Sequence, residues 1–142
     1  MNITAPDHPL AAWHALVQGR DTSGLPALLA DEVVFHSPVV HTPQRGRPIV
    51  SAYLTAALAV IGNDAFRYVR QIVGEREAVL EFVTTIDGVQ VNGIDLITWN
   101  AQGLIVDFKV MIRPLKAIEL IHRTMGQMLA SRAGGVMPDK PA

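Results

Sequence analysis

The chain of 142 residues contains no cysteine and no long hydrophobic run. Without cysteine it has neither a disulfide framework nor thiol chemistry, and a reducing compartment is permitted. The longest apolar run, residues 56–61, is far shorter than the roughly 20 residues that a helix needs to cross a bilayer. The N-terminus also lacks the basic start and long apolar segment of a signal peptide. We therefore expect a cytoplasmic protein that has no membrane partner.

The chain also has no large excess of positive or negative charge. The 12 basic and 13 acidic residues are interspersed, and no basic stripe indicates binding to nucleic acid. With 49% hydrophobic and 18% charged residues, the composition is that of a globular chain. The length fits one domain, which we place at residues 1–132. A mobile tail rich in glycine and proline is expected at residues 133–142.

The spacing of apolar residues and capping signals predicts four helices. The first is capped by Asp7 and ends near residue 19, and a short second one is capped by Ser23 and ends at residue 30. Two more are expected at residues 47–61 and 115–132. The last helix carries an apolar stripe of Leu115, Ile118, Ile121, Met125, Met128 and Leu129. A short strand at residues 32–37 and a loop at residues 39–46 lie between the second and the third predicted helix.

Antiparallel strands are predicted at residues 66–73 and throughout residues 79–113. Asp87-Gly88 is a strong signal for a two-residue hairpin turn, and the four-residue segment 100–103 is a weaker one. A further turn at residues 74–77 joins the first of these strands to the rest. The chain thus has helices before and after an antiparallel meander, which is typical of an α+β architecture.

These turns predict which residues face each other across the sheet. The first hairpin places Leu80 opposite Asp95, the second places Asp95 opposite Phe108, and the turn at residues 74–77 pairs Val69 with Phe82. Side chains alternate between the two faces of a strand. One face then collects Leu80, Phe82, Thr84, Val91, Asp95, Ile97, Trp99, Val106, Phe108, Val110 and Ile112.

Asp95 is the one carboxylate on this otherwise apolar face. Burial of an isolated carboxylate is unfavourable, so we expect a raised pKa and a neutral acid. A neutral acid in a pocket donates a hydrogen bond to the carbonyl or enolate oxygen of a ligand. The alternative is an aspartate that is hydrogen-bonded internally, to Tyr53 or Trp99, with no role in binding.

The opposite face of the predicted sheet mixes apolar and charged side chains. It carries Val83, Ile94, Leu96, Ile105 and Met111 beside Glu81, Asn92, Asp107, Lys109 and Arg113, with Arg70 paired to Glu81. Such a half-apolar face suits a subunit interface better than open solvent. We therefore expect a homodimer through this outer sheet face.

Two segments, A-D-E-V-V-F-H-S-P at residues 30–38 and G-I-D-L-I-T-W-N-A-Q-G-L-I-V-D-F-K-V-M-I-R-P at residues 93–114, carry a family resemblance. Together with the element order they resemble the nuclear transport factor 2-like superfamily, and within it the SnoaL-like and ketosteroid-isomerase-like branch, over roughly residues 8–125. The resemblance implies a cystatin-like α+β fold. In it a cone-shaped, strongly curved antiparallel sheet and helices that cover one face enclose a pocket, and the back of the sheet often forms dimers.

The resemblance also assigns positions to individual residues. Asp95 falls where ketosteroid isomerases keep a protonated aspartic acid in the oxyanion hole. Ser37 occupies the position of the catalytic base, and Ala12 lies near that of the oxyanion-hole tyrosine, while Tyr53 lies close to another pocket tyrosine. Gly93 stands where related epoxide hydrolases have an arginine. One of three isomerase groups is retained, so steroid isomerisation by that mechanism is not expected.

Histidines are the remaining candidates for proton transfer, because imidazole carries a proton near neutral pH. His36 and His41 flank the end of the first strand, and His36 and Ser37 alternate, so only one of them points inward. The resemblance favours Ser37 inside. His8, His14 and His122 have no metal-ligand spacing with each other or with acids, so no metal site is expected.

Aromatic side chains make up only 6% of the chain, and five of them would line or close the pocket unless they serve only as core: Trp13, Tyr53, Phe82, Trp99 and Phe108. A small, largely apolar ligand is therefore the expected partner. Two functions remain. One is an enzyme without an organic cofactor that isomerises, cyclises or hydrates a carbonyl-containing metabolite, using Asp95, Tyr53 and His36 or His41. The other is a non-catalytic ligand-binding or dimeric accessory domain.

Overall fold

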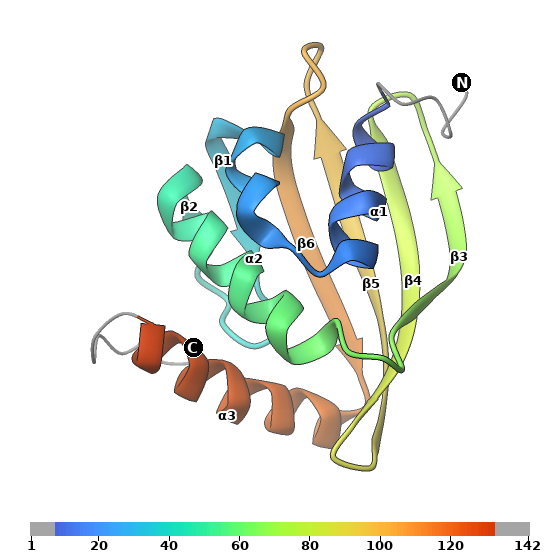
Figure 1. Ribbon diagram of the computed structural model, residues 1–142, viewed down its shortest axis with the longest axis vertical. Helices are drawn as coiled ribbons and strands as arrows, with labels where there is room; N and C mark the ends of the chain where they lie inside the picture. Colours follow the sequence, from blue (N-terminus) through green and yellow to red (C-terminus); the bar gives the residue numbers. More distant parts are fainter. Residues whose placement is uncertain (1–7, 133–142) are drawn as a thin grey trace.

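A computed structural model describes residues 8–132 of the chain. Its centre is a six-stranded, curved sheet with the strand order β2-β1-β6-β5-β4-β3. The helices lie over one face of this sheet, and α3 crosses the end at which the β4–β5 hairpin turns (Figure 1). The predicted α+β fold with helices on one face is therefore confirmed. The predicted mobile tail, residues 133–142, lies outside the described residues.

The three long helices are α1 (Pro9–Gly19), α2 (Arg47–Ile61) and α3 (Leu115–Arg132), as predicted. The short second helix is instead a 3-10 helix, η1 (Thr22–Leu28), which is capped by Asp21 and contains Pro26. Asp7, the predicted cap of α1, lies outside the described residues. His8 is the N-cap, and its Nδ1 accepts a hydrogen bond of 3.1 Å from the amide of Leu10.

The strands are β1 (Leu29–His36), β2 (Gln44–Arg45), β3 (Arg67–Val73), β4 (Glu77–Ile86), β5 (Val89–Trp99) and β6 (Ile105–Arg113). The β4–β5 register is confirmed, with Leu80 opposite Asp95 across the hairpin. Its turn has positive φ at Asp87 (49°) and Gly88 (78°), which is the backbone that a tight hairpin turn requires. The short strand β2, in a segment predicted as loop, pairs with β1.

The predicted β5–β6 register is wrong by two residues. Asp95 faces Val110 and not Phe108. One residue of the shift arises at the hairpin end, where Trp99 pairs with Ile105 and not with Leu104, and the interruption between Thr98 and Trp99 adds the second. The interruption also exchanges the sheet faces of Ile105 and Val106. Ile105 pairs with Trp99 and is buried, whereas Val106, which was predicted on the core face, is only half-buried. A bulge of this kind adds one residue to a strand and reverses the facing of the residues beyond it.

A second bulge lies in β3 and changes the site. Val69 was expected opposite Phe82, but Tyr68 takes that position, and the ladder resumes with Arg70 opposite Glu81. Val69 is the extra residue and is 48% exposed. Tyr68 consequently points to the core face of the sheet, where strict alternation would have placed its neighbour.

One pairing in the sheet is parallel, between β1 and β6, while all the others are antiparallel. It brings the end of β1 beside the middle of β6, with Phe35 opposite Phe108. The loop after β1 is thereby held at the helix-covered side of the sheet. This loop contains Ser37 and becomes part of the candidate site.

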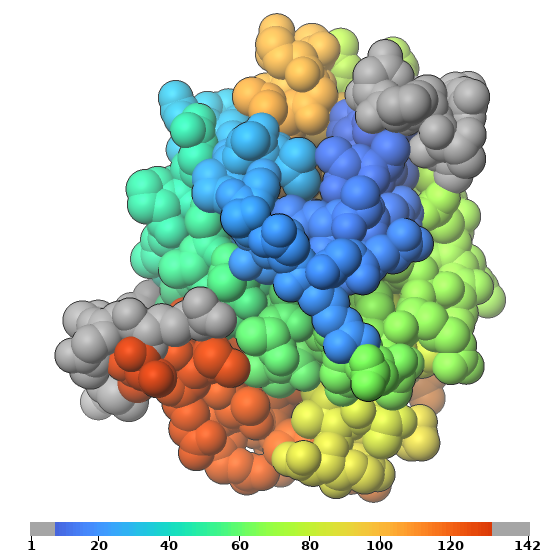
Figure 2. Space-filling model, in the orientation of Figure 1, coloured from blue at the N-terminus to red at the C-terminus, as the bar shows by residue number. Residues whose placement is uncertain are grey.

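The hydrophobic core fills the space between the sheet and the helices. Its largest fully buried side chains include Trp13, Phe35, Phe82 and Phe108. Figure 2 shows α1, η1, α2 and α3 as an almost continuous layer over the sheet. Most of the predicted stripe of α3 is confirmed, since Ile121 and Leu129 are buried and Met125 and Met128 pack against the core. Leu115 is the exception at 69% exposed, and Ala117 and Leu120 are buried in addition.

Candidate functional site

A cavity of about 70 Å³ lies inside this core, between the sheet and the helices. Most of its wall is aliphatic and aromatic. The polar side chains in the wall are those of Ser37, Tyr53, Tyr68, Asp95 and His122. The site therefore combines an apolar volume with a few polar groups, which is the general character of small-molecule sites in proteins.

Asp95 is placed in this wall by the middle of β5. It is only 7% exposed, and burial, partly offset by a hydrogen bond from Tyr68, raises the pKa of its carboxyl group from 3.8 to about 7. The predicted rise in the pKa of Asp95 is thus confirmed. Near neutral pH this carboxyl group is present in both its neutral and its ionised form, so it can donate a hydrogen bond or accept a proton.

Tyr68 is the hydrogen-bond partner of Asp95. Its hydroxyl group donates a bond of 2.5 Å to Oδ2 of Asp95, and its oxygen accepts one of 3.0 Å from Nε1 of Trp13. Burial and the nearby Asp95 raise the pKa of Tyr68 well above 10. The phenol therefore keeps its proton and orients the carboxyl group of Asp95.

Sequence reasoning missed Tyr68 because of the bulge at Val69, although one signal was available. In a strand without a bulge, Arg67 and Arg70 lie on opposite faces, so one arginine would enter the core. Both are exposed. Arg67 and Arg70 can both face solvent only if the strand contains one extra residue between them. With that extra residue at Val69, Tyr68 faces the core.

Six of the predicted site residues meet in the cavity wall: Trp13, Ser37, Tyr53, Phe82, Asp95 and Phe108. The side chain of Ser37 is hydrogen-bonded within its own loop, since its Oγ accepts hydrogen bonds from the amides of Val39 (3.0 Å) and Val40 (3.3 Å). The wall residues that the sequence did not single out as a site include Tyr68 on β3 and His122 on α3.

The other three predicted site residues lie away from the cavity. His36 points to the outer side of the sheet, where its Nε2 lies 2.9 Å from Oδ1 of Asp107. His41 is exposed and lines a separate outer cleft together with His36. Trp99 is buried elsewhere in the core and contacts the ring of His8 edge-on, at a centroid distance of 5.4 Å.

The structure explains why Gly93 stands at the position where related epoxide hydrolases have an arginine. A Cβ at this position would lie 2.5 Å from Cζ of Phe82 and 2.6 Å from the carbonyl oxygen of Met111. No side chain fits there without moving the β-ladder. The ring of Phe82 occupies the space instead and stacks on Phe66, with centroids 5.3 Å apart.

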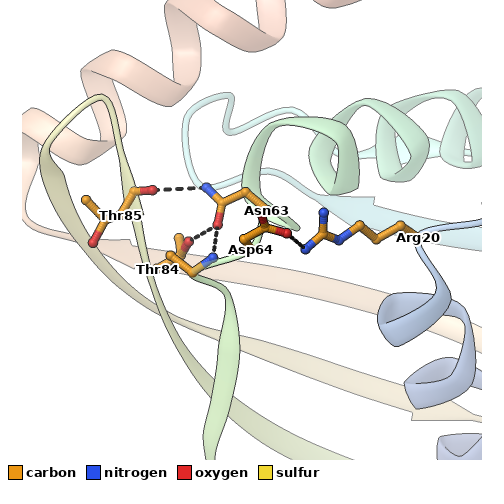
Figure 3. A network of polar contacts seen from close by, with 6 residues as sticks. Arg20, Asn63, Asp64, Thr84 and Thr85 are labelled. Carbon is orange, nitrogen blue, oxygen red and sulfur yellow. Dashed lines mark hydrogen bonds and ion pairs between the residues drawn. The ribbon is translucent and has the colours of Figure 1, made fainter.

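Phe66 lines the cavity from the loop between α2 and β3. Asn63, in the same loop, holds it in place (Figure 3). The side chain of Asn63 donates to the carbonyl oxygen of Thr85 (3.0 Å) and accepts from Oγ1 of Thr84 (2.7 Å). On the other side of the loop, Arg20 at the end of α1 forms an ion pair with Asp64. The loop is thus tied both to β4 and to α1.

Within residues 8–132, no three histidine, aspartate or glutamate side chains are grouped closely enough to hold a metal ion. In the same part of the chain, no helix has both the length and the hydrophobicity of a membrane span.

The SnoaL-like domain model matches residues 10–108 of the chain. A crystal structure of a steroid delta-isomerase from Pseudomonas aeruginosa is 42% identical, with 89% of this chain and 92% of that chain covered and a TM-score of 0.84. A protein with a cystatin-like fold from Silicibacter pomeroyi is 31% identical, with 94% of each chain covered and a TM-score of 0.84. No protein of curated function matches the chain in sequence.

More distant structures show the fold alone. A protein from Catenulispora acidiphila with a ketosteroid isomerase-like fold, in complex with trimethylamine, is 18% identical, with 79% and 88% of the two chains covered and a TM-score of 0.59. The predicted superfamily, nuclear transport factor 2-like with its SnoaL-like branch, is confirmed. This fold and family suggest a small-molecule binding or isomerase-type function.

Proposed function

The chain belongs to the SnoaL-like domain family, and we propose that it is an isomerase-type enzyme for a small, hydrophobic carbonyl compound. The observation that carries the proposal is the contact between Tyr68 and Asp95 in the wall of an apolar cavity. A carboxyl group with a pKa of about 7 in such a place is suited to proton chemistry near neutral pH.

The neutral form of Asp95 is the one that stabilises the reaction in this proposal. Tyr68 donates to Oδ2, which leaves the other carboxyl oxygen, carrying the proton, for the carbonyl oxygen of the substrate. When the substrate loses a proton beside its carbonyl group, negative charge develops on that oxygen. A preorganised donor in an apolar site stabilises such a charge more strongly than water does.

The similarity to the steroid delta-isomerase of Pseudomonas aeruginosa supports a reaction of this type, the shift of a double bond beside a carbonyl group. The size of the cavity argues for a smaller substrate than a steroid. About 70 Å³ is well below the roughly 300–1,000 Å³ that is usual for sites of drug-sized ligands. We therefore propose ketones of about one ring as substrates, with Tyr53 in contact with the ligand.

The test uses cyclohex-3-en-1-one, the conversion of which to conjugated cyclohex-2-en-1-one is followed by ultraviolet absorbance. We expect the wild-type protein to accelerate the conversion and Asp95→Ala to lower kcat about 100-fold or more. Asp95→Asn keeps an N–H donor toward the carbonyl oxygen and should lose less. Equal, complete loss in both variants would contradict the role of Asp95 as a neutral donor.

The second candidate is a ligand-binding domain without catalysis, and Ser37 is the observation in its favour. The family resemblance assigns Ser37 to the position of the isomerase base. Ser37 carries no charge and uses its Oγ to hold the loop after β1. A wild-type protein that binds cyclohexanone, detected by chemical-shift changes, but does not convert cyclohex-3-en-1-one would favour this function over the isomerase.

A further inference from the structure

The helix α3 contributes a continuous stripe to the cavity wall. His122, Met125, Gly126 and Leu129 all line the cavity, at the spacing i, i+3, i+4 and i+7 that places residues on one helical face. Asp95 and Tyr68 belong to the sheet, whereas this stripe belongs to the helix layer (Figure 1). The cavity thus has a sheet wall with an acid and a helix wall with an imidazole.

The imidazole of His122 has no partner among the residues that the structure describes. It is half-buried, and no hydrogen bond, ion pair or ring contact joins it to any other residue between 8 and 132. Other histidines of the fold are engaged: His14 with Gln71 at 2.7 Å, and His36 with Asp107 at 2.9 Å. With no partner among residues 8–132, this partly desolvated imidazole is available to hydrogen-bond water or a ligand in the cavity.

Gly126 lies one helical turn beyond His122, and no contact with a described residue requires glycine there. It is in the interior of an 18-residue helix, where glycine is unfavourable compared with alanine. Its φ is not positive, and a Cβ there would meet nothing within 4 Å among the described residues. Neither the backbone nor packing against residues 8–132 requires glycine, so its effect is to leave open space beside the imidazole.

We propose that His122 is the proton carrier of the site and that Gly126 leaves the room in which the reacting carbons of the substrate lie beside it. The inference rests on the proposed isomerase function. It also supplies, from the helix wall of the cavity, the base that Ser37 cannot provide. The sheet wall then binds the carbonyl oxygen, and the helix wall handles the carbon-bound proton.

For cyclohex-3-en-1-one the step is balanced without any further reagent. The imidazole takes a proton from C2, and the electron pair of the broken C–H bond moves into the conjugated system, which places negative charge on the carbonyl oxygen. The imidazolium then returns the proton to C4, the carbonyl bond is restored, and the double bond lies between C2 and C3. The imidazole ends in the form in which it began.

The first experiment compares His122→Gln with Arg123→Gln, a substitution at the adjacent, exposed position. Glutamine keeps a polar side chain of similar reach but cannot carry the proton. We expect His122→Gln to lower kcat for cyclohex-3-en-1-one at least about 100-fold, with KM and the binding of cyclohexanone changed less than about threefold. Arg123→Gln should behave as the wild type does.

The second experiment compares Gly126→Ala with Gln127→Ala, again an exposed neighbour on α3. Alanine favours the helix, so the melting temperature of Gly126→Ala should rise. Its methyl group enters the space beside His122, so KM for the enone and the dissociation constant for cyclohexanone should rise as well. A glycine with a purely structural role would not produce a more stable protein that binds ligand less well.

The outcomes separate the two proposals. If the wild type binds no cyclohexanone, the proposed function fails and the inference fails with it. If the wild type converts the enone and His122→Gln converts it equally fast, the inference is overturned while the proposed function stands. Binding by the wild type without conversion also overturns the proton-carrier role, as does unchanged binding in Gly126→Ala.

Discussion

The hydroxyl group of Tyr68 on β3 donates a 2.5 Å hydrogen bond to the carboxyl group of Asp95 on β5, across the intervening strand β4. The contact depends on the bulge at Val69, which turns Tyr68 toward the core. It joins a buried acid, a buried phenol and the indole of Trp13 in one chain of hydrogen bonds. The protonation state of Asp95 is therefore coupled to Tyr68, a residue outside its own strand.

Removal of the Tyr68 hydroxyl should raise the pKa of Asp95 further. Burial raises this pKa, and the hydrogen bond from Tyr68 is the influence that lowers it. In Tyr68→Phe only the burial remains, so we expect the carboxyl group to titrate clearly above 7, as measured by carbon-detected NMR.

The matched control is Thr84→Val, which deletes a buried hydroxyl group that donates to Asn63 and not to Asp95. It should leave the titration of Asp95 unchanged. A Tyr68→Phe protein in which Asp95 titrates as in the wild type would show that this hydrogen bond does not favour the carboxylate.

Asp95 should make the protein less stable as the pH rises toward 7. Its pKa in the folded protein, about 7, lies above the value of 3.8 for an unperturbed aspartate, so between these values the folded state binds more protons than the unfolded state. The free energy of unfolding then falls with rising pH and levels off above 7. The pKa difference corresponds to a loss on the order of 4 kcal/mol.

Asp95→Asn isolates this effect, because asparagine does not ionise and all other groups titrate in both proteins. We expect the free energy of unfolding of Asp95→Asn, relative to the wild type, to increase steadily between pH 4 and pH 8. Urea denaturation at several pH values measures it. A difference that is independent of pH would mean that Asp95 titrates alike in the folded and unfolded chain.

The position of Asp95 could be predicted because its contacts are set by a local signal. The Asp87-Gly88 turn determines the register of β4 and β5, and alternation then places Asp95 on the apolar face. Tyr68 could not be placed in the same way, because no turn residue in the sequence marks the position of a bulge. The exposed pair Arg67 and Arg70 was the available signal.

Contacts between distant segments were beyond sequence reasoning. The parallel pairing of β1 with β6 joins strands that are separated by most of the chain, and no turn specifies it. Which face of α3 meets the cavity depends on how the helix settles against the sheet. For this reason the apolar stripe included exposed Leu115, while His122 and Gly126 were not recognised as cavity residues.

Gly93→Ala should destabilise the protein strongly. The new methyl group would collide with the ring of Phe82 and with the backbone carbonyl of Met111, which belongs to the paired strand β6, so the β-ladder would have to shift. We expect a loss of about 1–3 kcal/mol in the free energy of unfolding, measured by chemical denaturation.

Gly74→Ala is the control for Gly93→Ala, because a Cβ at Gly74 makes only ordinary contacts of 3.5 Å with Glu77. It should change the free energy of unfolding by less than about 1 kcal/mol. A Gly93→Ala protein as stable as Gly74→Ala would contradict the close approach of β5 to Phe82.

We propose that the outer sheet face binds a second copy of the chain. Ile72 and Met111 stand out on this face, 60% and 50% exposed, next to the cross-strand pair of Arg70 and Glu81. In a two-fold dimer the same patch occurs on both subunits, so Met111→Glu introduces two facing charges and should weaken dimerisation at least about tenfold.

The control is Ile49→Glu, on α2 and 40% exposed, which should leave dimerisation unchanged. Analytical ultracentrifugation distinguishes these outcomes, and a wild-type protein that is monomeric at micromolar concentration would refute the proposal.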